Sequence, residues 1–99
     1  MDILNDVLKK LIDSLLLDMR AEVGTVLYDI SGAGHISKYD LELFEKTLTH
    51  KAQKNGYSVT VFYPKKVNRL KASADEKIVC RIVKMPDDYH VAIAMAKRD

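Results

Sequence analysis

The sequence comes nearest to a chemical motif in residues 24–37, GTVLYDISGAGHIS, where an apolar run meets two closely spaced glycines. A dinucleotide-binding loop requires G-x-G-x-x-G, because its third glycine lets the following helix pack against the strand. Gly32 and Gly34 match the first two glycines, but Ser37 stands at the third position. No Gly-Lys-Ser or Gly-Lys-Thr of a P-loop follows either. We therefore interpret Gly32 and Gly34 as a tight turn between two strands, where glycine readily adopts positive φ angles.

Metal-ligating and nucleophilic residues are few and scattered. His35, His50 and His90 are far apart in the sequence and form no Cys-x-x-Cys or His-x-x-x-His unit. A nucleophilic pair of Cys80 with a histidine brought close by folding is an alternative. The alternation of residues 76–85 instead places Cys80 on an apolar strand face, which predicts a buried structural thiol. We therefore expect no catalytic residues, no metal site and no cofactor, in a protein that is not an enzyme.

A basic segment at residues 64–71, PKKVNRLK, is the strongest candidate for a nucleic-acid contact. Its cations are Lys65, Lys66, Arg69 and Lys71. A basic β-arm can lie along a nucleic-acid backbone and release counterions from it. Lys51 and Lys54, at the end of a predicted helix, are expected to extend this patch. The alternative interpretation is a solvated loop or a protein contact.

Composition favours one folded domain over the whole chain, residues 1–99. Of its 99 residues, 47% are hydrophobic and 30% are charged, which is typical of a globular domain and not of a disordered one. Residues 1–45 contain nine acids against four bases, a net charge of −5, while residues 46–99 contain twelve bases against five acids, a net charge of +7. Such a charge asymmetry is typical of proteins that bind an acidic partner or a nucleic acid, or that self-associate head to tail.

The single cysteine and the apolar patterning indicate where the protein works. One cysteine allows no disulfide within the chain and fits a reducing compartment, so we expect a cytoplasmic protein. No apolar run approaches the roughly 20 residues of a membrane span, and Asp2 and Asp6 replace the basic start of a secretory signal. We expect no membrane partner.

Hydrophobic periodicity predicts two helices and several strands. Apolar residues recur at three- and four-residue steps in two segments and alternate in four others. The predicted elements are a helix at 2–20, a strand at 23–30, a turn at 31–34, a short return strand at 35–36, a helix at 38–55, a strand at 57–63, a polar connection at 65–76, and strands at 76–85 and 89–96 around a turn at 86–88.

Together these elements predict an α+β two-layer sandwich, with two helices on a mostly antiparallel sheet of four to five strands. The last strand has one face of large side chains and one face of small ones. The large face is Tyr89, Val91, Ile93 and Met95, and the small face is His90, Ala92, Ala94 and Ala96. Because alanines let a helix approach a sheet closely, we predict a helix on the small face.

Three stretches in this order resemble the roadblock (dynein light-chain) family. They are the long helix that runs into VGTVLYDISGAGHIS, the amphipathic segment YDLELFEKTLTHKAQ, and the closing pair of strands in EKIVCRIVKMPDDYHVAIAMAKRD. A weaker similarity is to small archaeal chromatin-type domains with a basic β-arm. The connection at 65–76 is longer than the tight hairpin usual in the roadblock family.

The roadblock resemblance implies a non-enzymatic scaffold that forms dimers through its sheets and second helices and binds small GTPases or motor and signalling complexes. The second helix fits this because it carries two apolar stripes. Tyr39, Leu43 and Thr47 form the stripe expected to face a twin helix or another partner. We therefore predict a homodimeric adaptor or regulatory scaffold that binds a protein partner, with nucleic-acid binding as the alternative.

Overall fold

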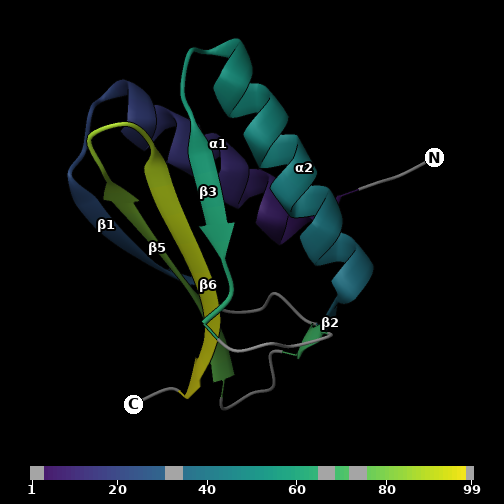
Figure 1. Ribbon diagram of the computed structural model, residues 1–99. Helices are drawn as coiled ribbons and strands as arrows, with labels where there is room; N and C mark the ends of the chain where they lie inside the picture. Colours follow the sequence, from purple (N-terminus) through teal and green to yellow (C-terminus); the bar gives the residue numbers. More distant parts are fainter. Residues whose placement is uncertain (1–3, 31–34, 65–68, 72–75, 98–99) are drawn as a thin grey trace.

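A computed structural model of the chain describes residues 4–30, 35–64, 69–71 and 76–97 (Figure 1). The elements are α1 (Asp6–Arg20), β1 (Thr25–Ile30), β2 (His35–Ser37), α2 (Lys38–Lys54), β3 (Val59–Phe62), β4 (Arg69–Lys71), β5 (Glu76–Lys84) and β6 (Tyr89–Lys97). Within these residues, two helices and a four-stranded mixed sheet form a two-layer α+β fold, which confirms the predicted fold class. The predicted turn at 31–34 lies outside the described residues.

The four-stranded sheet has the order β1-β5-β6-β3. β5 pairs antiparallel with β6, as the predicted turn at 86–88 implies, and also with β1, a pairing that the sequence did not predict. β3 pairs parallel with β6. The parallel pairing arises because the chain leaves β3, passes through β4 and β5, and returns as β6 in the same direction. β1 and β3 are therefore the two edges of the sheet.

A second, small sheet replaces two predicted features. β2 pairs antiparallel with β4, with Ile36 opposite Leu70. Within the described residues β2 does not pair with β1, so the predicted hairpin between residues 23–30 and 35–36 is wrong. Residues 65–76, predicted to be a polar connection, contain β4. The burial of Ile36 gives the reason, because its side chain closes the core at the start of α2 and is fully buried there.

α1 begins four residues later than predicted. The Asn5 side chain accepts a hydrogen bond from the backbone N–H of Val7 at 2.9 Å and so caps the helix. Arg20 occupies the last turn, where a cation interacts favourably with the helix dipole. Its buried apolar stripe consists of Leu8, Leu11, Ile12, Leu15 and Met19.

α2 begins where the sequence predicts. Ser37 and Asp40 form a capping box, in which the Ser37 hydroxyl accepts from the Asp40 N–H at 3.1 Å and the Asp40 carboxylate accepts from the Ser37 N–H at 2.9 Å. The helix ends before Asn55, and Gly56 follows with a φ of 83°. One stripe of α2 is buried, and its members are Leu41, Phe44, Leu48 and Ala52.

Both helices cover the same face of the four-stranded sheet (Figure 1). The covered face is the large one, where Tyr89, Val91 and Ile93 of β6 are buried. The prediction of a helix on the alanine face is therefore wrong, since Ala92 and Ala94 point away from both helices. The physical reason is area: large apolar side chains gain more free energy from leaving water than alanines do, about 25 cal/mol for each Å² buried.

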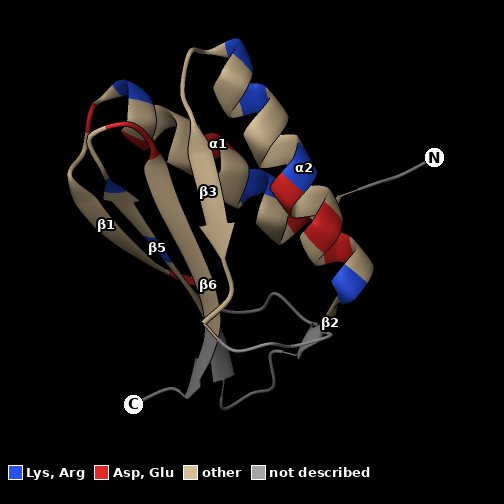
Figure 2. Cartoon of the chain, in the orientation of Figure 1, with Lys and Arg blue, Asp and Glu red and all other residues tan. Residues whose placement is uncertain are grey.

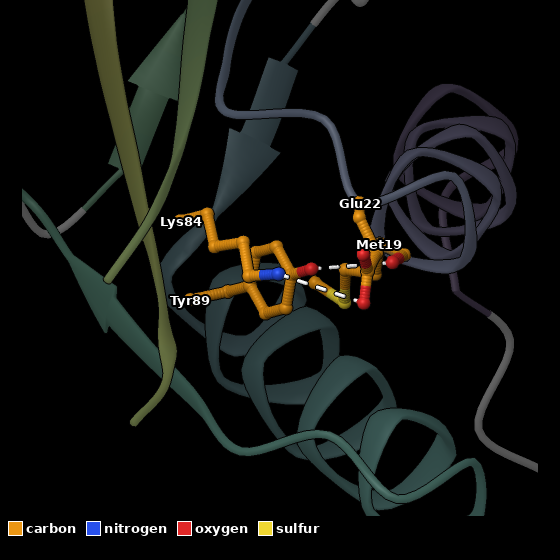
Figure 3. Close-up of polar contacts among 4 residues, drawn as sticks. All are labelled: Met19, Glu22, Lys84 and Tyr89. Atoms are coloured by element: carbon orange, nitrogen blue, oxygen red, sulfur yellow. Dashed lines mark hydrogen bonds and ion pairs between the residues drawn. The ribbon is translucent and has the colours of Figure 1, made fainter. Parts of the chain in front are cut away.

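The turn between β5 and β6 is fastened to the end of α1 (Figure 3). The Tyr89 hydroxyl donates to the Met19 carbonyl at 3.2 Å, and Lys84 Nζ lies 3.7 Å from Glu22 Oε1. The Tyr89 ring also meets the Tyr57 ring edge to face, with centroids 5.9 Å apart. These contacts hold this end of the sheet against the helical layer. The other face of the sheet, which includes Ala92 and Ala94, is not covered by either helix.

Candidate functional site

The face of the four-stranded sheet that the helices leave uncovered is the candidate site, and we call it the open face. Strand alternation and register define its members. They are Thr25, Leu27 and Asp29 of β1, Val79, Arg81 and Val83 of β5, His90, Ala92 and Ala94 of β6, and Thr60 and Phe62 of β3. Most of these side chains are small or apolar, which is unusual for a sheet face turned toward solvent.

Two large apolar side chains stand at the edges of the open face. Leu27 on β1 is 61% exposed and Phe62 on β3 is 43% exposed. The register places both in one row across the sheet, in the order Leu27, Arg81, Ala92, Phe62. Three strand spacings separate the two edges, about 14 Å at the usual strand separation.

Small side chains occupy the middle of the open face. Val79 of β5 lies beside Ala94 of β6, and Val83 lies beside His90. Ala92, which lies beside Arg81, is in the row between these two pairs. Val79, Val83, Ala92 and Ala94 are all half-buried and form what we call the floor. The open face is therefore a shallow apolar surface with a raised leucine at one edge and a raised phenylalanine at the other.

Arg81 places a positive charge at the centre of this surface. Its side chain is exposed, and its guanidinium makes no ion pair or hydrogen bond with any residue that the structure describes. Both carboxylates of the open-face region already have partners, Asp29 on β1 and Asp88 in the turn before β6. Arg81 is thus available to a carboxylate from another molecule.

A polar cluster closes one end of the open face. Thr60 Oγ1 donates to Asp88 Oδ2 at 2.7 Å, and His90 Nε2 lies 3.1 Å from Asp88 Oδ1. The His90 ring also meets the Phe62 ring edge to face at a centroid distance of 5.0 Å. The Asp88 carboxylate lies between the hydroxyl and the imidazole, whereas in a nucleophilic triad the imidazole lies between the hydroxyl and the carboxylate. The cluster therefore orients Phe62 and ties the edge strand to the turn.

Cys80 lies on the covered face, away from this cluster. Its side chain is fully buried, and burial raises the pKa of the thiol to about 12, so it stays protonated at neutral pH. This confirms the prediction of a buried thiol. His50 is exposed on α2, and in the described part of the chain no group of three acidic, histidine or cysteine side chains is placed to hold a metal ion.

The predicted partner stripe lies on the outer side of α2. Tyr39 is 52% exposed, and Leu43 and Thr47 are half-buried. A hollow of about 550 Å³ runs along this helix, and the lining residues that the structure describes all belong to α2, among them Tyr39, Leu43 and His50. The stripe thus forms a second surface, on the layer opposite the open face.

The backbone places the predicted basic residues near opposite ends of α2. Arg69 and Lys71 belong to β4, which pairs with β2 just before α2 begins. Lys51 and Lys54 lie in the last turn of α2, where the ribbon in Figure 2 is blue. The 16 residue steps of α2 separate these positions by about 24 Å at the usual helical rise. Lys65 and Lys66 lie outside the described residues.

The open face was not predicted from the sequence. The signal was present, because β6 alternates large and small apolar residues and β5 alternates Val79, Arg81 and Val83 with the apolar Ile78, Cys80 and Ile82. We assigned the small face to a helix of the same chain, whereas in the structure no described helix covers it.

Comparisons with protein-family models, with curated proteins and with solved structures found no match to this chain. Among the described residues, neither helix is long and apolar enough to cross a bilayer.

Proposed function

We propose that this protein is a non-enzymatic adaptor that binds a protein partner through the open face. The observation that supports this is the pair of large apolar side chains, Leu27 and Phe62, that the open face exposes at its two edges, with the small side chains of the floor and the exposed Arg81 between those edges. Single exposed apolar residues are common on protein surfaces, but a contiguous apolar surface is typical of an interaction site. The partner's class, whether a small GTPase or another signalling protein, is part of the proposal that the roadblock resemblance suggests.

Self-association through α2 is the second part of the proposal. Tyr39, Leu43 and Thr47 lie on the layer opposite the open face, so two copies joined there would leave both open faces accessible. An adaptor needs at least two separate binding surfaces, and this arrangement provides them. The face formed by α2 is isologous in such a pair, because both copies contribute the same helix.

Sedimentation measurements test the self-association. We expect the protein to sediment as a dimer at micromolar concentration and Leu43→Glu to sediment as a monomer, because the new carboxylate would be buried against an apolar partner. Lys9→Glu is the matched control, since Lys9 is exposed on α1, and it should remain a dimer. A monomeric parent protein would refute this part of the proposal.

Photo-crosslinking tests the open face. A photoreactive aromatic residue at position 62 should give a covalent adduct with a second protein in the native cells, because Phe62 would lie inside the complex. The same residue at position 9 should give none. Equal adducts at both positions, or none at position 62, would contradict the assignment.

A further inference from the structure

We infer that the open face binds an amphipathic helix of a partner protein that carries an acidic residue within its apolar stripe. This inference rests on the proposed function and adds the chemistry of the partner. It depends on the shape of the surface and on the charge at its centre.

The width of the open face suits a helix that lies along its strands. The backbones of Leu27 and Phe62 lie about 14 Å apart by strand spacing, and a helix with its side chains is about 10–12 Å wide. Between these edges, Ala92, Ala94 and Val79 are too small to hold an approaching helix away, and Arg81 is the long side chain that such a helix would cover. One helix laid along the strands would therefore span most of the open face, and its own side chains would contact Leu27 at one edge and Phe62 at the other.

The charge at the centre decides which helix fits. A helix that covers the floor also covers Arg81, and a buried guanidinium is strongly unfavourable without a paired carboxylate. Neither Asp29 nor Asp88 is free to serve, because both already have partners. A Glu or Asp on the incoming helix would supply the missing carboxylate, which a guanidinium binds through two parallel hydrogen bonds.

The same charge disfavours a second copy of this chain on the open face. Two open faces stacked about a central twofold axis would bring the two Arg81 side chains together, and neither would find a carboxylate. A partner of opposite charge is therefore the better occupant, which leaves α2 for self-association.

Selection from a displayed library of helical peptides, randomised without charge bias, provides the test. We expect the enriched peptides to be amphipathic helices with one acidic residue in the apolar stripe. Their binding should shift the backbone amide signals of β5 and β6, which lie under the floor, and leave those of α2 unchanged. Peptides that bind as extended strands, that shift α2 instead, or that fail to rise above background would overturn the inference.

A charge exchange makes the test specific to Arg81. Arg81→Glu should weaken the selected peptide by at least about tenfold, roughly the contribution of one good ion pair in an interface, and replacing the peptide's acid by Arg should restore binding. Lys9→Glu makes the same charge change on α1 and should leave binding unaltered. If Arg81→Glu has no effect, or if the exchanged pair does not recover, the acidic helix is the wrong partner.

These outcomes are distinct from a failure of the proposed function. If position 62 crosslinks to a protein in cells but the selected peptides are not acidic helices, the adaptor proposal stands and this inference fails. If position 62 gives no adduct, the open face is not a docking surface and both fail.

Discussion

Raising the pH should destabilise this protein through Cys80. The thiol is fully buried on the covered face of the sheet, and burial raises its pKa from 9.0 to about 12. The folded chain therefore keeps the Cys80 proton at a pH where the unfolded chain has lost it. Because the folded pKa is the higher one, the contribution of Cys80 to stability is complete below about pH 9 and declines as the pH rises toward 12.

The expected size follows from the linkage between proton binding and folding. One proton that only the folded state holds changes the free energy of unfolding by about 1.4 kcal/mol for each pH unit. Between pH 8 and pH 10 the thiol should thus remove about 1.4 kcal/mol, since the unfolded thiol ionises mainly above its pKa of 9.0. Tyrosines and lysines also titrate in this range, so the effect of Cys80 has to be isolated by substitution.

Urea unfolding of the parent protein and of Cys80→Ala, followed by circular dichroism across this pH range, isolates it. The alanine variant should be less stable at pH 8 because it leaves a small cavity. Its disadvantage should shrink by about 1.4 kcal/mol at pH 10, because it has no thiol to ionise. Parallel stability curves would refute the reasoning, as they would mean that Cys80 titrates equally in both states. Rapid modification of the native thiol by a disulfide reagent would refute it independently.

Two further perturbations test other contacts. Tyr89→Phe should lower the free energy of unfolding by about 1 kcal/mol, because it leaves the buried Met19 carbonyl without its hydrogen bond. Tyr28→Phe should cost less, because the hydrogen bond that it removes is only partly buried and water can replace it. Equal losses in urea unfolding would contradict this order. Binding of labelled duplex DNA, followed by fluorescence anisotropy, should be weak, and Lys51→Ala with Lys54→Ala should barely change its salt dependence, because the last turn of α2 lies about 24 Å along the helix from the end that adjoins β4. A steep salt dependence that this double variant abolishes would instead support the nucleic-acid alternative.

Local patterns predicted the elements of this fold well. Periodicity near 3.6 residues located both helices, and Ser37 with Asp40 located the start of α2, because a capping box depends only on residues three apart. Strand alternation in β5 correctly placed Ile78, Cys80 and Ile82 on one face, which is buried, and Val79, Arg81 and Val83 on the other. These features depend on near neighbours in the sequence, which is why the sequence alone predicts them.

Features that depend on distant segments were predicted less well. Nothing near Ile36 indicates that β2 pairs with β4 across more than 30 residues, and nothing near Val59 indicates a parallel pairing with β6. The open face was missed for a related reason. Both faces of β6 are apolar, and the helices pack on the face whose side chains bury more area, so the described helices leave the alanine face uncovered.

The most direct test of the central claim is whether the crosslink from position 62 depends on Leu27, at the far edge of the open face. We would measure the adduct yield in native cells for the protein with a photoreactive residue at position 62, with and without Leu27→Ser. Leu27 is 61% exposed, so the substitution should change the free energy of unfolding by no more than about 0.5 kcal/mol. If the open face is a docking surface, the adduct yield should fall by about tenfold while the protein stays folded, since one partner must span both edges. An unchanged yield would mean that Phe62 contacts its neighbour without the rest of the face, and it would contradict the account.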